Sequence, residues 1–158
     1  MSIPRWLAVL TLSLGAAVVM PAQILSTASA PARQFSFLPV GLASSETAQI
    51  NVVNLASNSA SGTAASCTGT VSFLNTSNVT IGPVTSFTIA TGETSSVTLP
   101  YSATGGSGAR VLIRGVVLLT ETKSTAAPCV LQTSLETFDT STGVTHLLIG
   151  SGDAVRPR

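Results

Sequence analysis

The chain has 158 residues, of which 8% are charged and 44% are hydrophobic, and its formal net charge is +1. With only seven lysine and arginine residues in total, it offers neither a basic surface for nucleic acid nor a polybasic surface for membranes. Disorder is also disfavoured, because it requires low hydrophobicity or high net charge. We therefore expect a folded domain whose solubility depends on Ser and Thr hydroxyls.

The first 30 residues have the order of a secretory signal peptide. Arg5 supplies one positive charge, residues 6–20 are apolar, and Pro21 then ends any helix. Small residues follow, and we expect cleavage after Ala28, so that residues 1–28 are removed. The alternative is an uncleaved anchor, but about 15 apolar residues fall short of the roughly 20 that span a bilayer. The sequence predicts a secreted or periplasmic protein without membrane insertion after cleavage.

Residues 29–158 are predicted to form a single domain with short flexible N- and C-terminal tails. The first strand is expected over residues 48–55, where apolar and polar residues alternate. The apolar parity changes at Val53, which predicts a β-bulge. A serine-rich loop follows over residues 57–66, and alternation returns in a strand over residues 67–73.

A hairpin is predicted over residues 87–99. Phe87 and Ile89 lie in its first strand, and Gly92 suits a turn position with positive φ. Before it, residues 75–80 hold two formal glycosylation sequons, whose alternative interpretation is a plain turn. After the hairpin, a flexible loop is expected over residues 102–108.

The longest predicted strand covers residues 110–120. One face carries Val111, Ile113, Val117 and Leu119, and the other carries Leu112, Val116 and Leu118. We expect this strand at the centre of a sheet and covered on both sides for part of its length. Its second face is covered either by the same domain or by another molecule.

Two more strands are expected over residues 130–138 and 144–149. They flank the turn-rich residues 139–143, where Asp139 is followed by two Thr, a Ser and a Gly. A calcium loop is the functional alternative, but it usually supplies several carboxylates where this turn has one. The segment is therefore interpreted as an Asx-type turn.

Cys67 and Cys129 are the only cysteines, and export would take them to an oxidising compartment. We predict that they form a disulfide, which would stabilise the fold by roughly 4 kcal/mol for a loop of about 60 residues. The alternatives are a metal thiolate site or a reactive thiol. Neither cysteine has a histidine or a second cysteine nearby in sequence, which argues against both.

The pattern as a whole predicts an all-β fold of about seven to eight short strands, arranged as a single antiparallel β-sandwich or a small barrel. Residues 87–99 carry an apolar strand, a turn at Gly92 and Glu93, and a second apolar strand. This segment resembles the strand-turn-strand segment of secreted bacterial immunoglobulin-like domains. The resemblance implies an immunoglobulin-like sandwich with an adhesion, spacing or binding role.

Reactive side chains are few. His146 is the sole histidine, which excludes multi-histidine metal sites and requires any Ser-His-Asp triad to use it. No Gly-x-Ser-x-Gly segment occurs, and the carboxylates are scattered. We therefore predict no catalytic residue, no metal ligand and no cofactor.

Arg110 and Arg114 share one face of their strand. They are interpreted as covering apolar surface with their stems and pairing with Glu136 or Glu121. The alternative is a pair of arginines that faces a ligand.

The sequence thus favours a non-catalytic secreted structural or interaction domain with an accessory, adhesive or assembly role. Its partner is an unknown protein or surface ligand, not nucleic acid, and self-association is open. The alternative is a small secreted hydrolase with a site around His146. The two differ in whether His146 lies within hydrogen-bonding distance of both a serine hydroxyl and a carboxylate.

Overall fold

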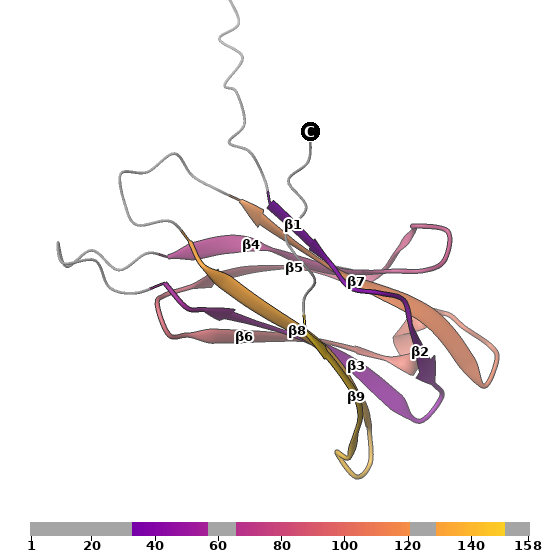
Figure 1. Ribbon diagram of the computed structural model, residues 1–158. Helices are drawn as coiled ribbons and strands as arrows, with labels where there is room; N and C mark the ends of the chain where they lie inside the picture. The colour runs from indigo at the N-terminus through magenta and orange to yellow at the C-terminus, as the bar shows by residue number, and fades with distance from the viewer. Residues whose placement is uncertain (1–32, 57–65, 121–128, 151–158) are drawn as a thin grey trace, which may run out of the picture.

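The computed structural model describes residues 33–56, 66–120 and 129–150, which form two packed β-sheets (Figure 1). The predicted signal peptide, residues 1–28, lies outside these ranges and stays a prediction. So do the expected terminal tails and nearly all of the loop predicted over residues 57–66. Among the described residues, no helix is long and apolar enough to cross a bilayer.

The described part contains nine strands and one short 3-10 helix. In chain order they are β1 (Arg33–Ser36), β2 (Val40–Ala43), β3 (Glu46–Asn54), β4 (Cys67–Leu74), β5 (Thr80–Ile89), β6 (Thr94–Pro100), η1 (Tyr101–Thr104), β7 (Arg110–Thr120), β8 (Leu131–Asp139) and β9 (Thr145–Gly150).

All paired strands are antiparallel. The first sheet has the order β1-β7-β4-β5, and the second has the order β6-β3-β8-β9. β1 pairs with the C-terminal part of β7, and β2 pairs with its N-terminal part, so the two short strands together form one edge. The predicted all-β class and antiparallel sandwich are confirmed.

Alternation sends one side of each strand into the space between the sheets. β4 shows this regularly, because every second residue from Cys67 to Phe73 is buried. The largest fully buried apolar side chains come from both sheets and are Phe73, Leu42, Ile50, Leu99, Ile113, Leu119, Leu135, Val52, Val71 and Val117. This single core joins the two sheets.

β7 is a central strand, as predicted, with β4 on one side and β1 and β2 on the other. Its two-sided cover is more limited than expected. Val116 is 8% exposed on the outward face, but Leu112 is 52% exposed and Leu118 is 37% exposed. Leu112 pairs with Gly41 of β2, which has no side chain to cover it, and Leu118 lies between Gln34 of β1 and Thr70 of β4.

The predicted hairpin over residues 87–99 is wrong. β5 pairs with β4 in the first sheet and β6 pairs with β3 in the second, so the chain crosses between sheets at the intervening turn. Gly92 has φ of 80°, as predicted, and the Glu93 N–H donates to Ala90 O at 3.0 Å. Alternation cannot distinguish a hairpin from such a crossing, because both strands turn their apolar sides to the same core.

The bulge predicted at Val53 is also wrong. β3 keeps an unbroken register against β8 from Glu46 to Asn54. Val53 therefore points outward and is half-buried, while Asn54 points inward and is fully buried. The prediction placed Val53 inward because it is apolar. Asn54 is inward instead, because hydrogen bonds in the core satisfy its amide, and the sequence pattern does not reveal them.

Three strand segments were not predicted: β1, β2 and the first half of β5. Pro39 separates β1 from β2, and Pro83 interrupts alternation in β5. Gly82, with φ of 67°, lies where β5 shifts register against β4. The loop predicted over residues 102–108 begins with the 3-10 helix η1 rather than irregular chain.

Candidate functional site

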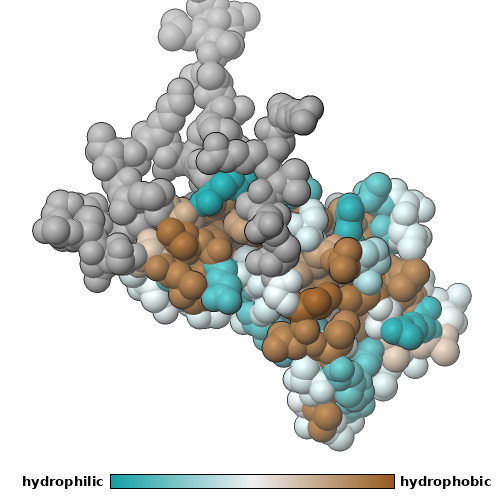
Figure 2. All heavy atoms as spheres, in the orientation of Figure 1, coloured by the Kyte–Doolittle hydropathy of each residue, from teal (hydrophilic) through white to brown (hydrophobic). Residues whose placement is uncertain are grey.

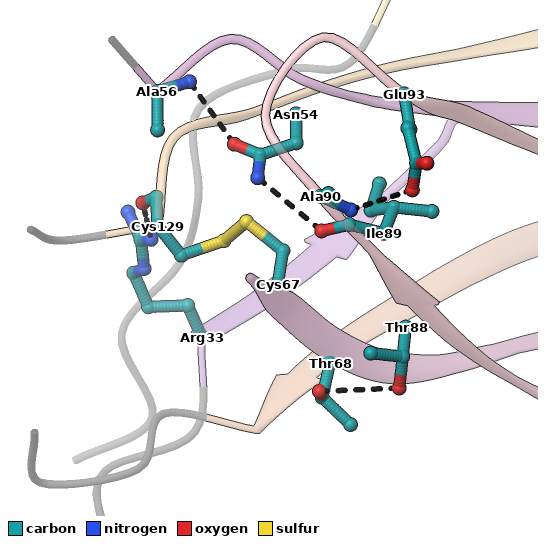
Figure 3. Close-up of a disulfide and its surroundings, with 10 residues drawn as sticks. All are labelled: Arg33, Asn54, Ala56, Cys67, Thr68, Thr88, Ile89, Ala90, Glu93 and Cys129. Atoms are coloured by element: carbon teal, nitrogen blue, oxygen red, sulfur yellow. Dashed lines mark hydrogen bonds between the residues drawn. A yellow bond between two sulfur atoms is a disulfide. The ribbon is translucent and has the colours of Figure 1, made fainter. Parts of the chain in front are cut away.

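The predicted disulfide is present and joins the two sheets (Figure 3). Cys67 begins β4 in the first sheet, and Cys129 lies two residues before β8 in the second. Their Cα atoms are 5.4 Å apart, and the sequence separation is 62. Cys67 is fully buried, so the bridge belongs to the core and exposes no thiol.

Hydrogen bonds from an asparagine amide and an arginine guanidinium surround this bridge. Asn54 Nδ2 donates to Ile89 O at 3.3 Å, and Asn54 Oδ1 accepts from Ala56 N at 3.0 Å (Figure 3). Arg33 Nη2 donates to Cys129 O at 2.6 Å. The sequence analysis did not identify Asn54. Continuing the alternation of β3 without a bulge would have placed its side chain inward.

His146 lies at the opposite end of the sandwich, on the edge strand β9. The register of β8 against β9 shifts between Thr137 and Phe138, and His146 is the extra residue of this β-bulge. Its Nδ1 is 2.5 Å from Glu46 Oε1, at the start of β3. The bulge thus brings together two residues that are 100 positions apart.

The Glu46 carboxylate is held from several sides. Its Oε2 accepts from Ala43 N at 2.8 Å, and its residue is only 8% exposed. Burial raises the pKa of Glu46, but the Ala43 N–H, His146 and the charge of Arg110 outweigh it, so the pKa lies below its ordinary value of 4.5. Glu46 is therefore ionised at neutral pH, beside an imidazole whose side chain is 46% exposed.

This geometry supplies a carboxylate and an imidazole but not a serine nucleophile. Within the described ranges, the only hydrogen bond of the His146 side chain is the one to Glu46. Two hydroxyls close to Glu46 and to the β8–β9 turn, Thr47 Oγ1 and Thr140 Oγ1, are 2.9 Å apart and bonded to each other. Thr47 follows Glu46 in β3 and so faces the opposite side of the sheet.

The turn at Asp139 has the Asx-type geometry that the sequence predicted. Asp139 Oδ1 accepts from Ser141 N and Thr142 N at 3.0 and 2.8 Å, and from both of their hydroxyls. These bonds, led by the Ser141 hydroxyl, lower the pKa of Asp139 to about 2. In the part of the chain that the structure describes, no three His, Cys, Asp or Glu side chains gather as metal ligands would.

Neither arginine of β7 pairs with Glu136. Arg114 Nη2 donates to Asn78 Oδ1 at 2.8 Å, and Arg110 Nη2 lies 3.5 Å from Gly41 O. The predicted pairing is therefore wrong for that glutamate, because it lies on the other sheet.

Glu136 instead belongs to a polar network on the outer face of the second sheet. It accepts from Gln49 Nε2 and Asn51 Nδ2, both at 3.0 Å, and Ser96 Oγ donates to Asn51 Oδ1 at 2.6 Å. Glu121, the other predicted partner of the arginines, lies outside the described residues.

β9 carries two exposed apolar side chains, whereas the edge strand β5 carries one, Val84. Leu148 is 65% exposed and Leu147 is 39% exposed, and Val144 just before the strand is 57% exposed. Figure 2 shows hydrophobic surface in the region of the β8–β9 hairpin. The sequence predicted the strand but not its edge position, which depends on strand order.

No protein-family profile, no curated protein and no solved structure matches this chain. Function is therefore inferred from the geometry of the described residues.

Proposed function

We propose that the chain is an exported, non-catalytic structural domain with an immunoglobulin-like sandwich, which assembles with a second copy of itself through the free edge of β9. The observation that carries this proposal is the exposed apolar character of that edge. Leu147 and Leu148 are consecutive in β9 and so face opposite sides of the sheet, and among the described strands β9 has a neighbour, β8, on one side only. Such an edge exposes unpaired backbone groups that another extended chain can bind.

Proline lies within or at the end of each of the other three edges of the sandwich. Pro39 precedes β2, Pro83 lies within β5, and Pro100 ends β6. Proline cannot donate to a strand ladder, and natural proteins use it to block edge-to-edge pairing. β9 contains no proline, and its one bulge lies near its start, at His146. Among the described strands, β9 is therefore the one edge that has no proline within it or at its ends.

A second copy fits this edge by its chemistry. Two antiparallel β9 strands related by a two-fold axis would present the same surface to each other, which is the usual form of a symmetric dimer. β9 carries no Asp, Glu, Lys or Arg, so its apolar side chains would meet without like charges. The net charge of +1 adds little repulsion between copies.

Export and the immunoglobulin-like assignment have separate support. The charged, apolar and small-residue order of residues 1–28 is typical of a signal peptide. A buried disulfide is typical of proteins that fold in oxidising compartments. The segment that resembles immunoglobulin-like domains, residues 87–99, carries the chain from one sheet to the other.

Sedimentation equilibrium of the secreted protein tests the proposal. We expect concentration-dependent dimers, and we expect Leu148→Lys to weaken them at least about tenfold, because it places two charges in an apolar contact. Val84→Lys is the matched control, since Val84 is 56% exposed on β5, an edge interrupted by proline. Thermal unfolding checks that both variants fold. A monomer at every concentration, or equal effects of the two variants, would refute assembly through β9.

A hydrolase is the second candidate function, and the hydrogen bond between Glu46 and His146 is what favours it. A carboxylate that orients an imidazole is two-thirds of an acyl-transfer triad. Its test is ester hydrolysis by the secreted protein and by His146→Ala. An activity that disappears in a folded His146→Ala variant would establish this function in place of the first.

A further inference from the structure

A pocket of about 160 Å³ lies beside the N-terminal part of β7. The turn between β4 and β5 forms one wall, with Asn75, Thr76 and Asn78, and Pro39 forms part of the other. Leu112 and Arg114 of β7 complete this lining. The proposed contact strand β9 belongs to the other sheet, so this pocket is a separate feature of the surface.

The polar groups of the pocket are arranged as donors. Asn75 Oδ1 already accepts from Ser77 N and Val79 N, both at 2.9 Å. Asn78 Oδ1 already accepts from Arg114 Nη2 at 2.8 Å. Each side-chain oxygen of the two asparagines thus already accepts a hydrogen bond, whereas within the described residues their Nδ2 groups and the other guanidinium N–H groups donate none.

The only charge on the pocket lining is positive. No Asp or Glu is among the lining residues, and within the described ranges Arg114 has no carboxylate partner. The exposed side chain of Leu112, 52% exposed, and the ring of Pro39 add apolar surface beside this charge. A guanidinium next to amide donors is suited to a carboxylate, and the apolar residues are suited to a short hydrocarbon group.

The size of the pocket limits the ligand. Pockets for whole small molecules usually exceed roughly 300 Å³, so this one accommodates only a small group or the end of a larger ligand. We infer that the pocket binds a carboxylate that carries a small apolar group. The C-terminal residue of a polypeptide and a short free carboxylic acid share this chemistry. The inference does not depend on assembly through β9.

Titration by ¹H–¹⁵N NMR tests the inference on the folded secreted protein. The probes are N-acetylvaline and N-acetylvalinamide, which differ only in the carboxylate. We expect the acid to shift the side-chain amide signals of Asn75 and Asn78 saturably. The amide should bind at least about tenfold more weakly, because it lacks the charge-assisted hydrogen bonds.

Two variants locate the effect. Arg114→Gln should abolish the preference for the acid, whereas Arg110→Gln should keep it, because Arg110 lies on the same strand but outside the pocket lining.

A peptide that ends in valine distinguishes the two sources of the carboxylate. Tighter binding than N-acetylvaline indicates a polypeptide C-terminus, and equal binding indicates a small acid. The inference is overturned if acid and amide bind alike, if neither shifts these signals at tens of millimolar, or if Arg114→Gln retains the preference. Should Arg114→Gln fail to fold, the comparison of acid and amide on the unaltered protein decides.

Discussion

The two ends of the sandwich are held together in different ways. Where β4 and β8 begin, a disulfide joins the sheets, and the buried Asn54 ties β3 to β5 (Figure 3). Where β3 begins, the Glu46 carboxylate contacts the partly exposed His146 imidazole, and Asp139 organises the adjoining turn. One end is covalent and largely uncharged, and the other depends on ionisable groups.

The two ends therefore contribute differently to the pH dependence of stability. The Cys67–Cys129 bond and the amide hydrogen bonds of Asn54 do not titrate, so their contribution is independent of pH. The hydrogen bonds of Glu46 and Asp139 are stronger when the carboxylate is ionised, so part of their contribution depends on pH. β9, the proposed contact strand, begins at this second end, where local opening is expected to cost less free energy.

The largest expected effect is at the covalent end. Replacing Cys67 and Cys129 together with alanine should lower the free energy of unfolding by about 4 kcal/mol, because a loop closed across 62 positions is released in the unfolded state. Urea denaturation measures the loss. If the oxidised, denatured wild-type protein reacts with two equivalents of a thiol reagent, the bridge is absent and this prediction fails.

Asn54→Ala should destabilise by about 1–3 kcal/mol, because Ile89 O and Ala56 N would each lose a buried partner. The loss should be the same at pH 4 and pH 7, since no charge is involved. Asn51→Ala is the control, because Asn51 occupies the same strand but faces the more exposed outer side. A larger loss for Asn51 would show that the buried asparagine does not hold this end.

Glu46→Gln should cost about 1 kcal/mol or less at neutral pH, because the half-exposed His146 leaves the pair partly screened by solvent. The folded pKa of Glu46 lies below 4.5, so its stabilisation is complete above about pH 5 and is lost as the pH falls through the folded value. Denaturation from pH 6 to pH 3 should show a shallower acid loss in the variant. An unchanged pH profile would contradict the role of this carboxylate.

Asp139→Asn should have the smallest effect, because the amide keeps the side-chain oxygen that accepts the turn hydrogen bonds. The pKa of Asp139 is lowered from 3.8 to about 2, so its contribution is present above pH 4 and fades as the pH falls towards 2. Melting temperatures at pH 2, 4 and 7 should differ less in the variant. A variant that melts far below the wild type at pH 7 would show that the charge itself holds the turn.

The sequence predicts most of the fold that depends on local pattern. Alternation located β3, β4 and β7, and turn chemistry identified the Asp139 turn and the positive φ of Gly92. It failed where the answer depends on partners distant in sequence. Apolar and polar residues alternate on both sides of the turn at Gly92 whether the two strands form a hairpin or belong to different sheets. The pattern therefore could not distinguish a hairpin from a crossing.

The candidate sites follow the same rule. Two cysteines have one way to pair, which made the disulfide predictable. The contact between His146 and Glu46 joins residues 100 positions apart through a bulge, and no local signal marks it. The donor-lined pocket at Arg114 combines β7 with a turn and with Pro39, which only the folded arrangement brings together.

Amide hydrogen exchange at low and high protein concentration tests the central claim most directly. β6 and β9 are the two edges of the same sheet, and only β9 lacks proline and exposes leucines. We predict that amides of Thr145–Gly150 gain protection as concentration rises, while those of Thr94–Pro100 do not change. Unchanged protection of β9 at every concentration, or a gain confined to β6, would contradict assembly through β9.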